Sequence, residues 1–123
     1  LNGQQLWSEK SFTSLGDMSA ASDGQTILLA GFNHGIQALD SSGSVRESYL
    51  IEGTVCRVSC SFNADRIAAA TLERHLYWLA SDGQVLWATQ VDEDILRVIC
   101  DPLGEWLLCG FSSGHIVRLD WES

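Results

Sequence analysis

The chain has 123 residues, of which 46% are hydrophobic, so it is long enough and apolar enough to fold around a core of its own. Its 16 acidic and 7 basic residues give a formal net charge of −9, which argues against partners with a phosphate backbone, such as nucleic acids, and against anionic membrane surfaces. No segment approaches the roughly 20 apolar residues of a membrane helix. The sequence has no basic start followed by an apolar run, so it predicts no signal peptide.

The sequence repeats itself every 40 residues without a gap. Gly3, Gly43 and Gly83 fall in one column, within Asn-Gly-Gln-Gln-Leu-Trp, Ser-Gly-Ser-Val-Arg-Glu and Asp-Gly-Gln-Val-Leu-Trp. Trp7 falls on Trp87, two periods later, and many further columns match in the same register. A period of this length indicates a protein built from repeated structural units.

Each period predicts four short strands, and no window shows sustained helical periodicity. Turn pairs such as Asp23-Gly24 and Asp82-Gly83 separate the apolar runs, as hairpin connections require. In chain order the predicted strands are residues 5–8, 17–20, 26–30, 36–39, 45–48, 57–60, 66–70, 76–79, 85–89, 97–100, 106–110 and 116–119.

Four-stranded units at a period near 40 are typical of β-propeller blades. The third copy resembles a WD-repeat blade, because Asp101-Pro102-Leu103-Gly104 places Pro-x-Gly before the second strand. Its third strand ends in Leu119-Asp120-Trp121 where that family has Trp-Asp. The segment Asp-Gly-Gln-Val-Leu-Trp around Gly83 is similar instead to the repeats of pyrroloquinoline-quinone-type propellers. Either resemblance implies an all-β chain of three four-stranded antiparallel blades, and neither carries a function.

The repeat is cut out of phase with the blades. Residues 11–50 and 51–90 form two blades, residues 91–123 form a third blade without its fourth strand, and residues 1–10 are a fourth strand alone. Three blades are too few to close a ring, so we expect a head-to-tail homodimer with six blades. A longer propeller and a nine-bladed trimer are the alternatives. The residues expected to take part in strand exchange between copies are Gln5, Leu6, Trp7, Ser8, Leu119 and Trp121.

The resemblance to WD-type blades implies a docking face, formed by the loops from fourth to first strand and from second to third strand. Arginines at the start of two innermost strands are expected to act as anchors near the channel mouth, because arginine is enriched at interface hot spots. The residues expected to bind a protein or peptide partner are Asn33, His34, Arg57, Glu73, Arg74, Asp92, Asp94 and Arg97.

No metal site or cofactor is predicted. Asp92-Glu93-Asp94 supplies oxygen ligands for Ca²⁺, but its spacing lacks the alternating ligands and the glycine of an EF-hand loop. His75 and His115 share a repeat column that opens the third strand, away from the channel, so inheritance by repetition explains the pair.

The cysteines and tryptophans are expected to be core residues. Cys56, Cys60, Cys100 and Cys109 lie in apolar strand-like segments and form no Cys-x-x-Cys pair, which favours reduced buried thiols and a cytoplasmic location. Trp7 and Trp87 occupy equivalent fourth-strand positions, where we expect them to pack between blades.

The sequence therefore favours a non-catalytic interaction or scaffold module. It contains no Gly-x-Ser-x-Gly nucleophile turn and no phosphate-binding glycine loop. The alternatives are small-ligand or carbohydrate binding, or a fragment of a quinone-type propeller enzyme. The loop residues differ from copy to copy, which suits asymmetric protein docking better than a sugar site repeated in each blade.

Overall fold

The computed structural model describes residues 2–10 and 14–121, which form three antiparallel β-sheets. The first sheet contains β1 (Asp17–Ala20), β2 (Ile27–Ala30), β3 (Ile36–Leu39) and β4 (Val45–Tyr49). The second contains β5 (Val55–Cys60), β6 (Arg66–Thr71), β7 (His75–Ala80) and β8 (Val85–Gln90), and the third β9 (Ile95–Cys100), β10 (Trp106–Phe111) and β11 (Ile116–Asp120). In these described residues, no helix is long and apolar enough to cross a membrane.

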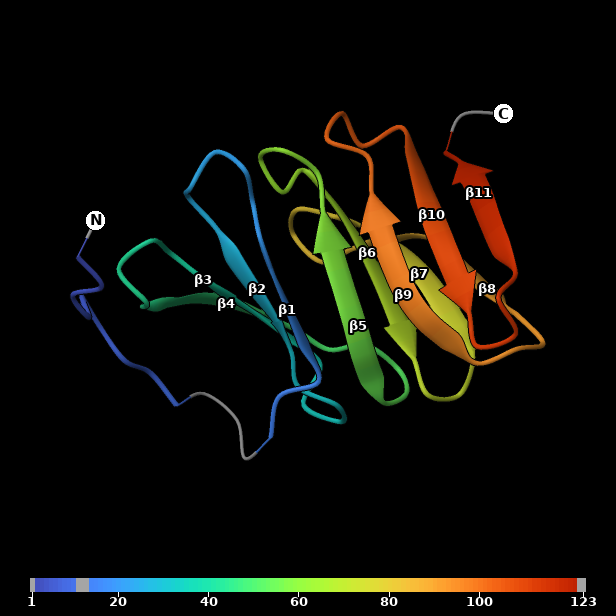
Figure 1. Ribbon diagram of the computed structural model, residues 1–123, viewed down its shortest axis with the longest axis horizontal. Helices are drawn as coiled ribbons and strands as arrows, with labels where there is room; N and C mark the ends of the chain where they lie inside the picture. Colours follow the sequence, from blue (N-terminus) through green and yellow to red (C-terminus); the bar gives the residue numbers. More distant parts are fainter. Residues whose placement is uncertain (1, 11–13, 122–123) are drawn as a thin grey trace.

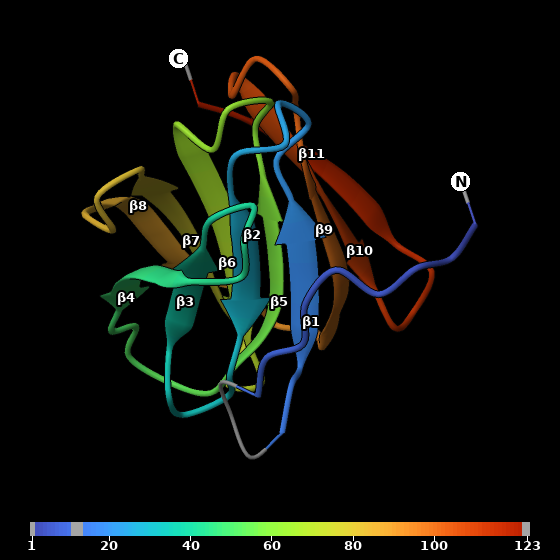
Figure 2. The ribbon, with the colours of Figure 1, turned by 90° about the vertical axis from the view of Figure 1, so that its left-hand side faces the viewer.

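The three sheets stand next to one another in chain order. Figures 1 and 2 show β1, β5 and β9 side by side, with β4 and β8 on the opposite side of the molecule. Polar side chains of one innermost strand hold the backbone of the next: Asp17 Oδ2 accepts from Val58 N at 3.1 Å, and Ser59 Oγ accepts from Cys100 N at 2.9 Å. Each bond joins one innermost strand to the next across a sheet interface.

Two apolar clusters hold the sheets together, one in each interface. The first interface joins residues such as Leu28, Ile36, Tyr49, Tyr77 and Leu79 of the first and second sheets. Because strand side chains alternate between faces, β6 contributes Ala69 to this interface and Ala68 and Ala70 to the other. The second interface joins these alanines and Leu76 and Trp78 to Val98, Leu107, Cys109 and Phe111 of the third sheet. Burying each large side chain stabilises the fold by about 1.5–3 kcal/mol.

Eleven of the twelve predicted strands are confirmed, each within two residues of its predicted ends. The strand predicted at residues 5–8 is wrong for the single chain, because this segment forms no strand. It lies beside the first sheet, at the opposite end of the molecule from β11 (Figure 1). The expected partner of this segment is the third sheet of another copy. Trp7 packs on Gly43 instead, and its Nε1 donates to the Ser41 carbonyl at 3.1 Å.

Candidate functional site

The connections from second to third strand and from fourth to first strand gather at one end of the molecule, the lower edge in Figure 1. Backbone hydrogen bonds join them: Leu72 N donates to the Thr54 carbonyl at 2.9 Å, and Ser112 N donates to the Asp94 carbonyl at 3.1 Å. We call this rim the loop face. The loop face carries His34 and five other residues predicted to bind a partner, which are Asn33, Glu73, Arg74, Asp92 and Asp94.

Arg74 connects the second sheet to the third at the loop face. Its Nε lies 3.0 Å from Asp94 Oδ1, and its Nη1 donates to the Asp92 carbonyl at 3.1 Å. The tight β6–β7 turn holds Arg74 at a φ of 70°, a left-handed conformation that non-glycine residues seldom adopt. The structure thus brings Arg74, Asp92 and Asp94 together, and both side chains of the ion pair remain about half exposed.

Glu73 is bound to the loop that precedes β5. Its Oε1 accepts from Thr54 N and its Oε2 from Thr54 Oγ1, both at 2.7 Å. These bonds, first that from the Thr54 backbone, lower the pKa of the Glu73 carboxyl. A Cβ at Gly53 would lie 2.7 Å from Glu73 Oε1, so the glycine leaves room for this contact.

Glu93, in the connection between β8 and β9, makes similar contacts with the third sheet. Ser113 Oγ donates to its Oε1, and His115 Nδ1 lies 3.3 Å from its Oε2. The bond from Ser113 is the main cause of the lowered pKa of Glu93, with a smaller contribution from His115. Sequence reasoning singled out the two aspartates that flank Glu93 but not Glu93 itself, because the pairing of its loop with the β10–β11 loop is visible only in the fold.

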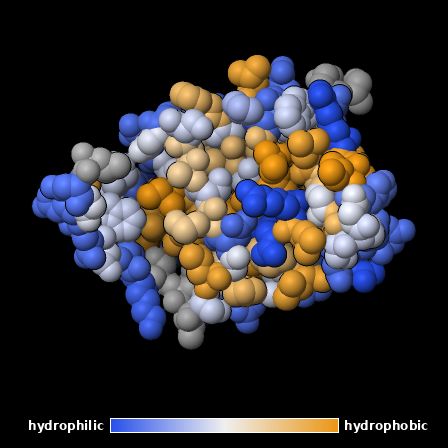
Figure 3. All heavy atoms as spheres, viewed as in Figure 1, coloured by the Kyte–Doolittle hydropathy of each residue, from blue (hydrophilic) through white to orange (hydrophobic). Residues whose placement is uncertain are grey.

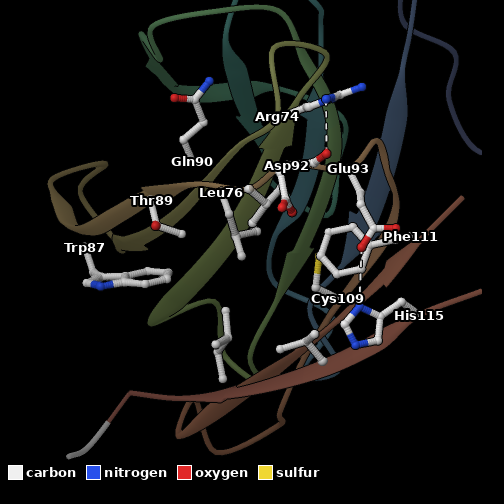
Figure 4. Close-up of a pocket in the computed structure, with 13 residues that line it drawn as sticks. Arg74, Leu76, Trp87, Thr89, Gln90, Asp92, Glu93, Cys109, Phe111 and His115 are labelled. Carbon is white, nitrogen blue, oxygen red and sulfur yellow. Dashed lines mark hydrogen bonds and ion pairs between the residues drawn. The ribbon is translucent and has the colours of Figure 1, made fainter. Parts of the chain in front are cut away.

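A cavity of about 810 Å³ opens beside these residues, between the second and third sheets (Figure 4). Charged and polar side chains stand at its mouth, and apolar side chains of β7, β10 and β11 form its floor. Its lining includes Arg74, Asp92, Glu93 and His115 at the mouth and Leu76, Trp87, Thr89, Cys109, Phe111, Val117 and Leu119 within. Burial raises the pKa of the Cys109 thiol to about 11, so the floor is uncharged at neutral pH.

The two arginines predicted as anchors lie on the innermost strands, as expected, and away from Arg74. Arg57 and Arg97 line a groove of about 530 Å³ along the innermost strands, with Asp17 of β1. Arg57 is tied down there, because its Nε donates to the Leu96 carbonyl and its Nη1 to the Cys56 carbonyl. The structure therefore separates the arginines of the inner strands from Arg74 and its carboxylates.

The inner-strand face is largely apolar around a small hydrophilic centre (Figure 3). Met18, Leu96 and Ile99 are 57%, 51% and 45% exposed. None of these three side chains belongs to the two clusters that join the sheets.

Trp7 and Trp87 are not core residues, contrary to the sequence-based expectation. They are 40% and 37% exposed, because no further strand covers them in the described chain. Trp87 lines the cavity, and Trp121, expected to take part in strand exchange, stacks on Trp78 with ring centroids 6.3 Å apart. Leu119 pairs with Leu107, and the outer edge of β11 has no neighbouring strand among the described residues.

The four cysteines are free thiols, as predicted. Cys56, Cys100 and Cys109 are buried and Cys60 is partly buried. Burial is the main cause that raises the pKa of each of these thiols. Within residues 2–10 and 14–121, no group of three or more His, Cys, Asp or Glu side chains could hold a metal ion.

No known family model and no curated protein sequence matches this chain. Many solved structures share its fold, and two of them show the range of the likeness. The β-propeller domain of Cps50 (Swd1) from Myceliophteria thermophila superimposes with a TM-score of 0.81 at 9% identity, over 94% of this chain and 38% of that chain. Hydrazine synthase from Kuenenia stuttgartiensis superimposes with a TM-score of 0.77 at 12% identity, over 98% of this chain and 36% of that chain.

At such identities the likeness shows the fold alone, and the chain spans little more than a third of the length of either neighbour. The two neighbours differ in what they are, a propeller domain and an enzyme, as expected of a fold that hosts unrelated activities. The resemblance predicted from the 40-residue repeat is confirmed: this chain consists of consecutive blades of a β-propeller, arranged as three antiparallel sheets.

Proposed function

We propose that the chain is a non-catalytic interaction module that binds a protein or peptide partner through its loop face. The observation that carries this proposal is the difference between equivalent loop positions. Glu73 and Ser113 share a repeat column, yet Glu73 accepts from Thr54 while Ser113 donates to Glu93. Such a surface presents a different set of donors and acceptors on each sheet, which suits one asymmetric partner.

The state of the thiols supports a role without nucleophilic catalysis by cysteine. The thiolate is the reactive form of cysteine, and burial disfavours it. The pKa of Cys100 is raised to about 12, first by burial, and that of Cys109 to about 11. Both thiols are therefore protonated at neutral pH and act as small apolar core groups.

Binding of a small ligand is the second candidate function, and the cavity between the second and third sheets favours it. A volume of about 810 Å³ lies within the range of small-molecule sites, roughly 300–1,000 Å³, and the lining combines an apolar floor with a few polar groups. A quinone-type propeller enzyme fragment and a carbohydrate site stay within this alternative.

Peptide selection tests the proposed function. A random 12-residue peptide library displayed on phage is selected against the immobilised chain, and enriched peptides are measured by fluorescence anisotropy. We expect their affinity to fall at least tenfold in Arg74→Ala and to stay unchanged in Asp82→Ala, which alters a turn away from the loop face. Absence of enriched peptides, or enriched peptides that bind both variants equally, would contradict the proposal.

We also propose that two copies close head to tail into a six-bladed ring. The first support is a repeated contact. Tyr49 of β4 lies on Gly83 of the second sheet and its hydroxyl donates to the Ser81 carbonyl at 2.6 Å. Trp7 makes the same pair of contacts one period earlier, with Gly43 and the Ser41 carbonyl. Residues 2–10 thus lie where the fourth strand of a preceding sheet would lie. In the ring, the other three strands of that sheet would come from a second copy.

The second support is complementarity between the two end sheets. Ala38 and the large Tyr77 belong to the first cluster, and the large Trp78 belongs to the second, against which Val117 packs. Each pair comes from the same two repeat columns on neighbouring sheets. Arg118 is the next residue of the column of Ala38 and Trp78, and Gln37 belongs to the column of Tyr77 and Val117. In a closed ring, Arg118 of one copy would therefore face Gln37 of the next. Gln37 Oε1 is buried without a hydrogen-bond partner in the described chain. Arg118 of the outer sheet is about half exposed and bonds to Asp120 through its Nε, and its guanidinium has further N–H donors. A donor that meets a buried acceptor removes the cost of leaving it unpaired, about 1–3 kcal/mol.

The solution mass tests this assembly. The chain has a mass of 13.5 kDa, so light scattering after size exclusion separates a monomer, a dimer and a trimer. We expect a dimer that dissociates in Arg118→Glu, with Arg46→Glu as the matched control on an exposed strand of the first sheet. A folded monomer would overturn the six-bladed ring, and a trimer would replace it by a nine-bladed one.

A further inference from the structure

We propose that the cavity between the second and third sheets receives a tyrosine side chain of the partner, carried by a basic peptide segment. This inference deepens the proposed function, on which it rests, by naming the chemistry that the loop face recognises. In the first interface, tyrosine side chains fill the positions that correspond to this cavity.

The first interface is filled by two tyrosine rings that have no counterpart in the second. Tyr77 of β7 and Tyr49 of β4 belong to the apolar cluster between the first and second sheets. One period later the chain places Val117 and Thr89 at these positions, and both line the cavity. In the described residues the third sheet also has no fourth strand, and Trp78 stands where the first sheet has Ala38. The cavity is the part of the second interface that neither these rings nor a fourth strand fills.

The hydrogen-bond acceptor of one missing phenol is still present. Tyr77 Oη donates to the Glu52 carbonyl at 2.9 Å in the first interface. The equivalent carbonyl in the second is that of Asp92, which lines the cavity and accepts one bond from Arg74 Nη1 at 3.1 Å. A carbonyl oxygen has two lone pairs, so a phenol hydroxyl that enters the cavity finds an acceptor already in place.

The charges at the mouth select the residues that flank the tyrosine. Asp92, Glu93 and Asp94 stand at or next to the mouth, and Arg74 is paired with the last of them. Hydrogen bonds from Ser113 and His115 keep Glu93 ionised, because they lower the pKa of its carboxyl. Three carboxylates against one guanidinium, on a chain of net charge −9, attract lysine or arginine on either side of the inserted ring.

Calorimetric titration of the full chain with three short peptides tests the proposal. The peptides are Gly-Lys-Tyr-Lys-Gly and its counterparts with phenylalanine or alanine at the centre, all capped at both ends. We expect the tyrosine peptide to bind at least tenfold more tightly than the alanine peptide, with the phenylalanine peptide in between. Equal affinity for all three peptides would overturn the proposal.

A variant that fills the cavity from within provides the second measurement. Val117→Tyr restores the residue of the first interface, and we expect it to weaken the tyrosine peptide at least tenfold while the chain stays folded by circular dichroism. Leu103→Tyr adds the same ring at a 78% exposed position in the β9–β10 connection, away from the loop face, and is expected to leave binding unchanged. Undiminished binding by Val117→Tyr would overturn the cavity as the tyrosine site.

Two outcomes separate this inference from the proposed function. Library-selected peptides that depend on Arg74 but lack aromatic residues and bind Val117→Tyr normally would keep the loop face and remove the tyrosine site. N-acetyltyrosinamide that binds as tightly as the full peptide would assign the cavity to a free aromatic molecule and overturn a peptide partner.

Discussion

The two interfaces of this molecule are built from equivalent strands, but they are filled differently, and in the described residues the third sheet has no fourth strand. In the first, the rings of Tyr49 and Tyr77 lie between the sheets and their hydroxyls bond to main-chain carbonyls. In the second, Thr89 and Val117 stand at the equivalent positions and an open cavity of about 810 Å³ results. Replacement of two side chains in the repeat columns, together with the absence of a fourth strand from the third sheet in the described residues, thus leaves open space between two sheets.

If the tyrosines close the first interface, removing one should have the largest effect. Tyr77→Val gives β7 the residue that β11 carries at the equivalent position. We expect it to lower the free energy of unfolding by about 2–4 kcal/mol, since it opens a cavity in a buried cluster. Urea unfolding followed by circular dichroism measures the loss. A change below about 0.5 kcal/mol would show that Tyr77 does not hold the sheets together.

The close approach of Tyr49 to Gly83 should have an intermediate effect. A Cβ at Gly83 would lie 2.3 Å from Tyr49 Cδ1, and the residue has a φ of +88°. Gly24 is the matched control, with a φ of +77° and no atom within 4 Å of such a Cβ. We expect Gly83→Ala to destabilise the chain by about 1–3 kcal/mol more than Gly24→Ala, because only the first displaces a packed ring. Equal losses in the two variants would place Tyr49 away from Gly83.

The hydroxyl of Tyr49 should contribute less than its ring. It donates to the Ser81 carbonyl at 2.6 Å and lies near Glu47. Tyr49→Phe removes these bonds and keeps the ring, so we expect a loss of about 1 kcal/mol in the free energy of unfolding. Chemical denaturation of the variant next to the parent chain checks the value. A loss as large as that of Tyr77→Val would mean that hydrogen bonding, and not ring packing, closes the first interface.

Much of the fold follows from the sequence, since alternating apolar runs and Asp-Gly or Ser-Gly turns mark eleven strands correctly. The strand at residues 5–8 fails because a strand needs a neighbour to pair with, and in the single chain Trp7 packs on Gly43 instead. The alternation of apolar and polar residues predicts where a strand can form, but it does not predict whether a sheet edge is available for that strand to pair with.

The candidate site was predicted in part. The loop face follows from the order of strands in a blade, so Glu73, Arg74, Asp92 and Asp94 could be grouped from the sequence. Arg57 was placed correctly on an innermost strand, but its bond to the Leu96 carbonyl could not be predicted, because it joins strands of different sheets. The replacement of Tyr77 by Val117 is visible in the repeat columns, yet its meaning depends on which columns face each other across an interface.

The most direct test of the difference between the interfaces is the thermal unfolding temperature of Val117→Tyr. If the second interface has room for a tyrosine ring beside the Asp92 carbonyl, the added ring gains burial without strain. We then predict an unfolding temperature equal to or above that of the parent chain. A fall of several degrees, as overpacking by about 1–3 kcal/mol would cause, would contradict the account, because it would mean that the space between the second and third sheets is not a vacant tyrosine site.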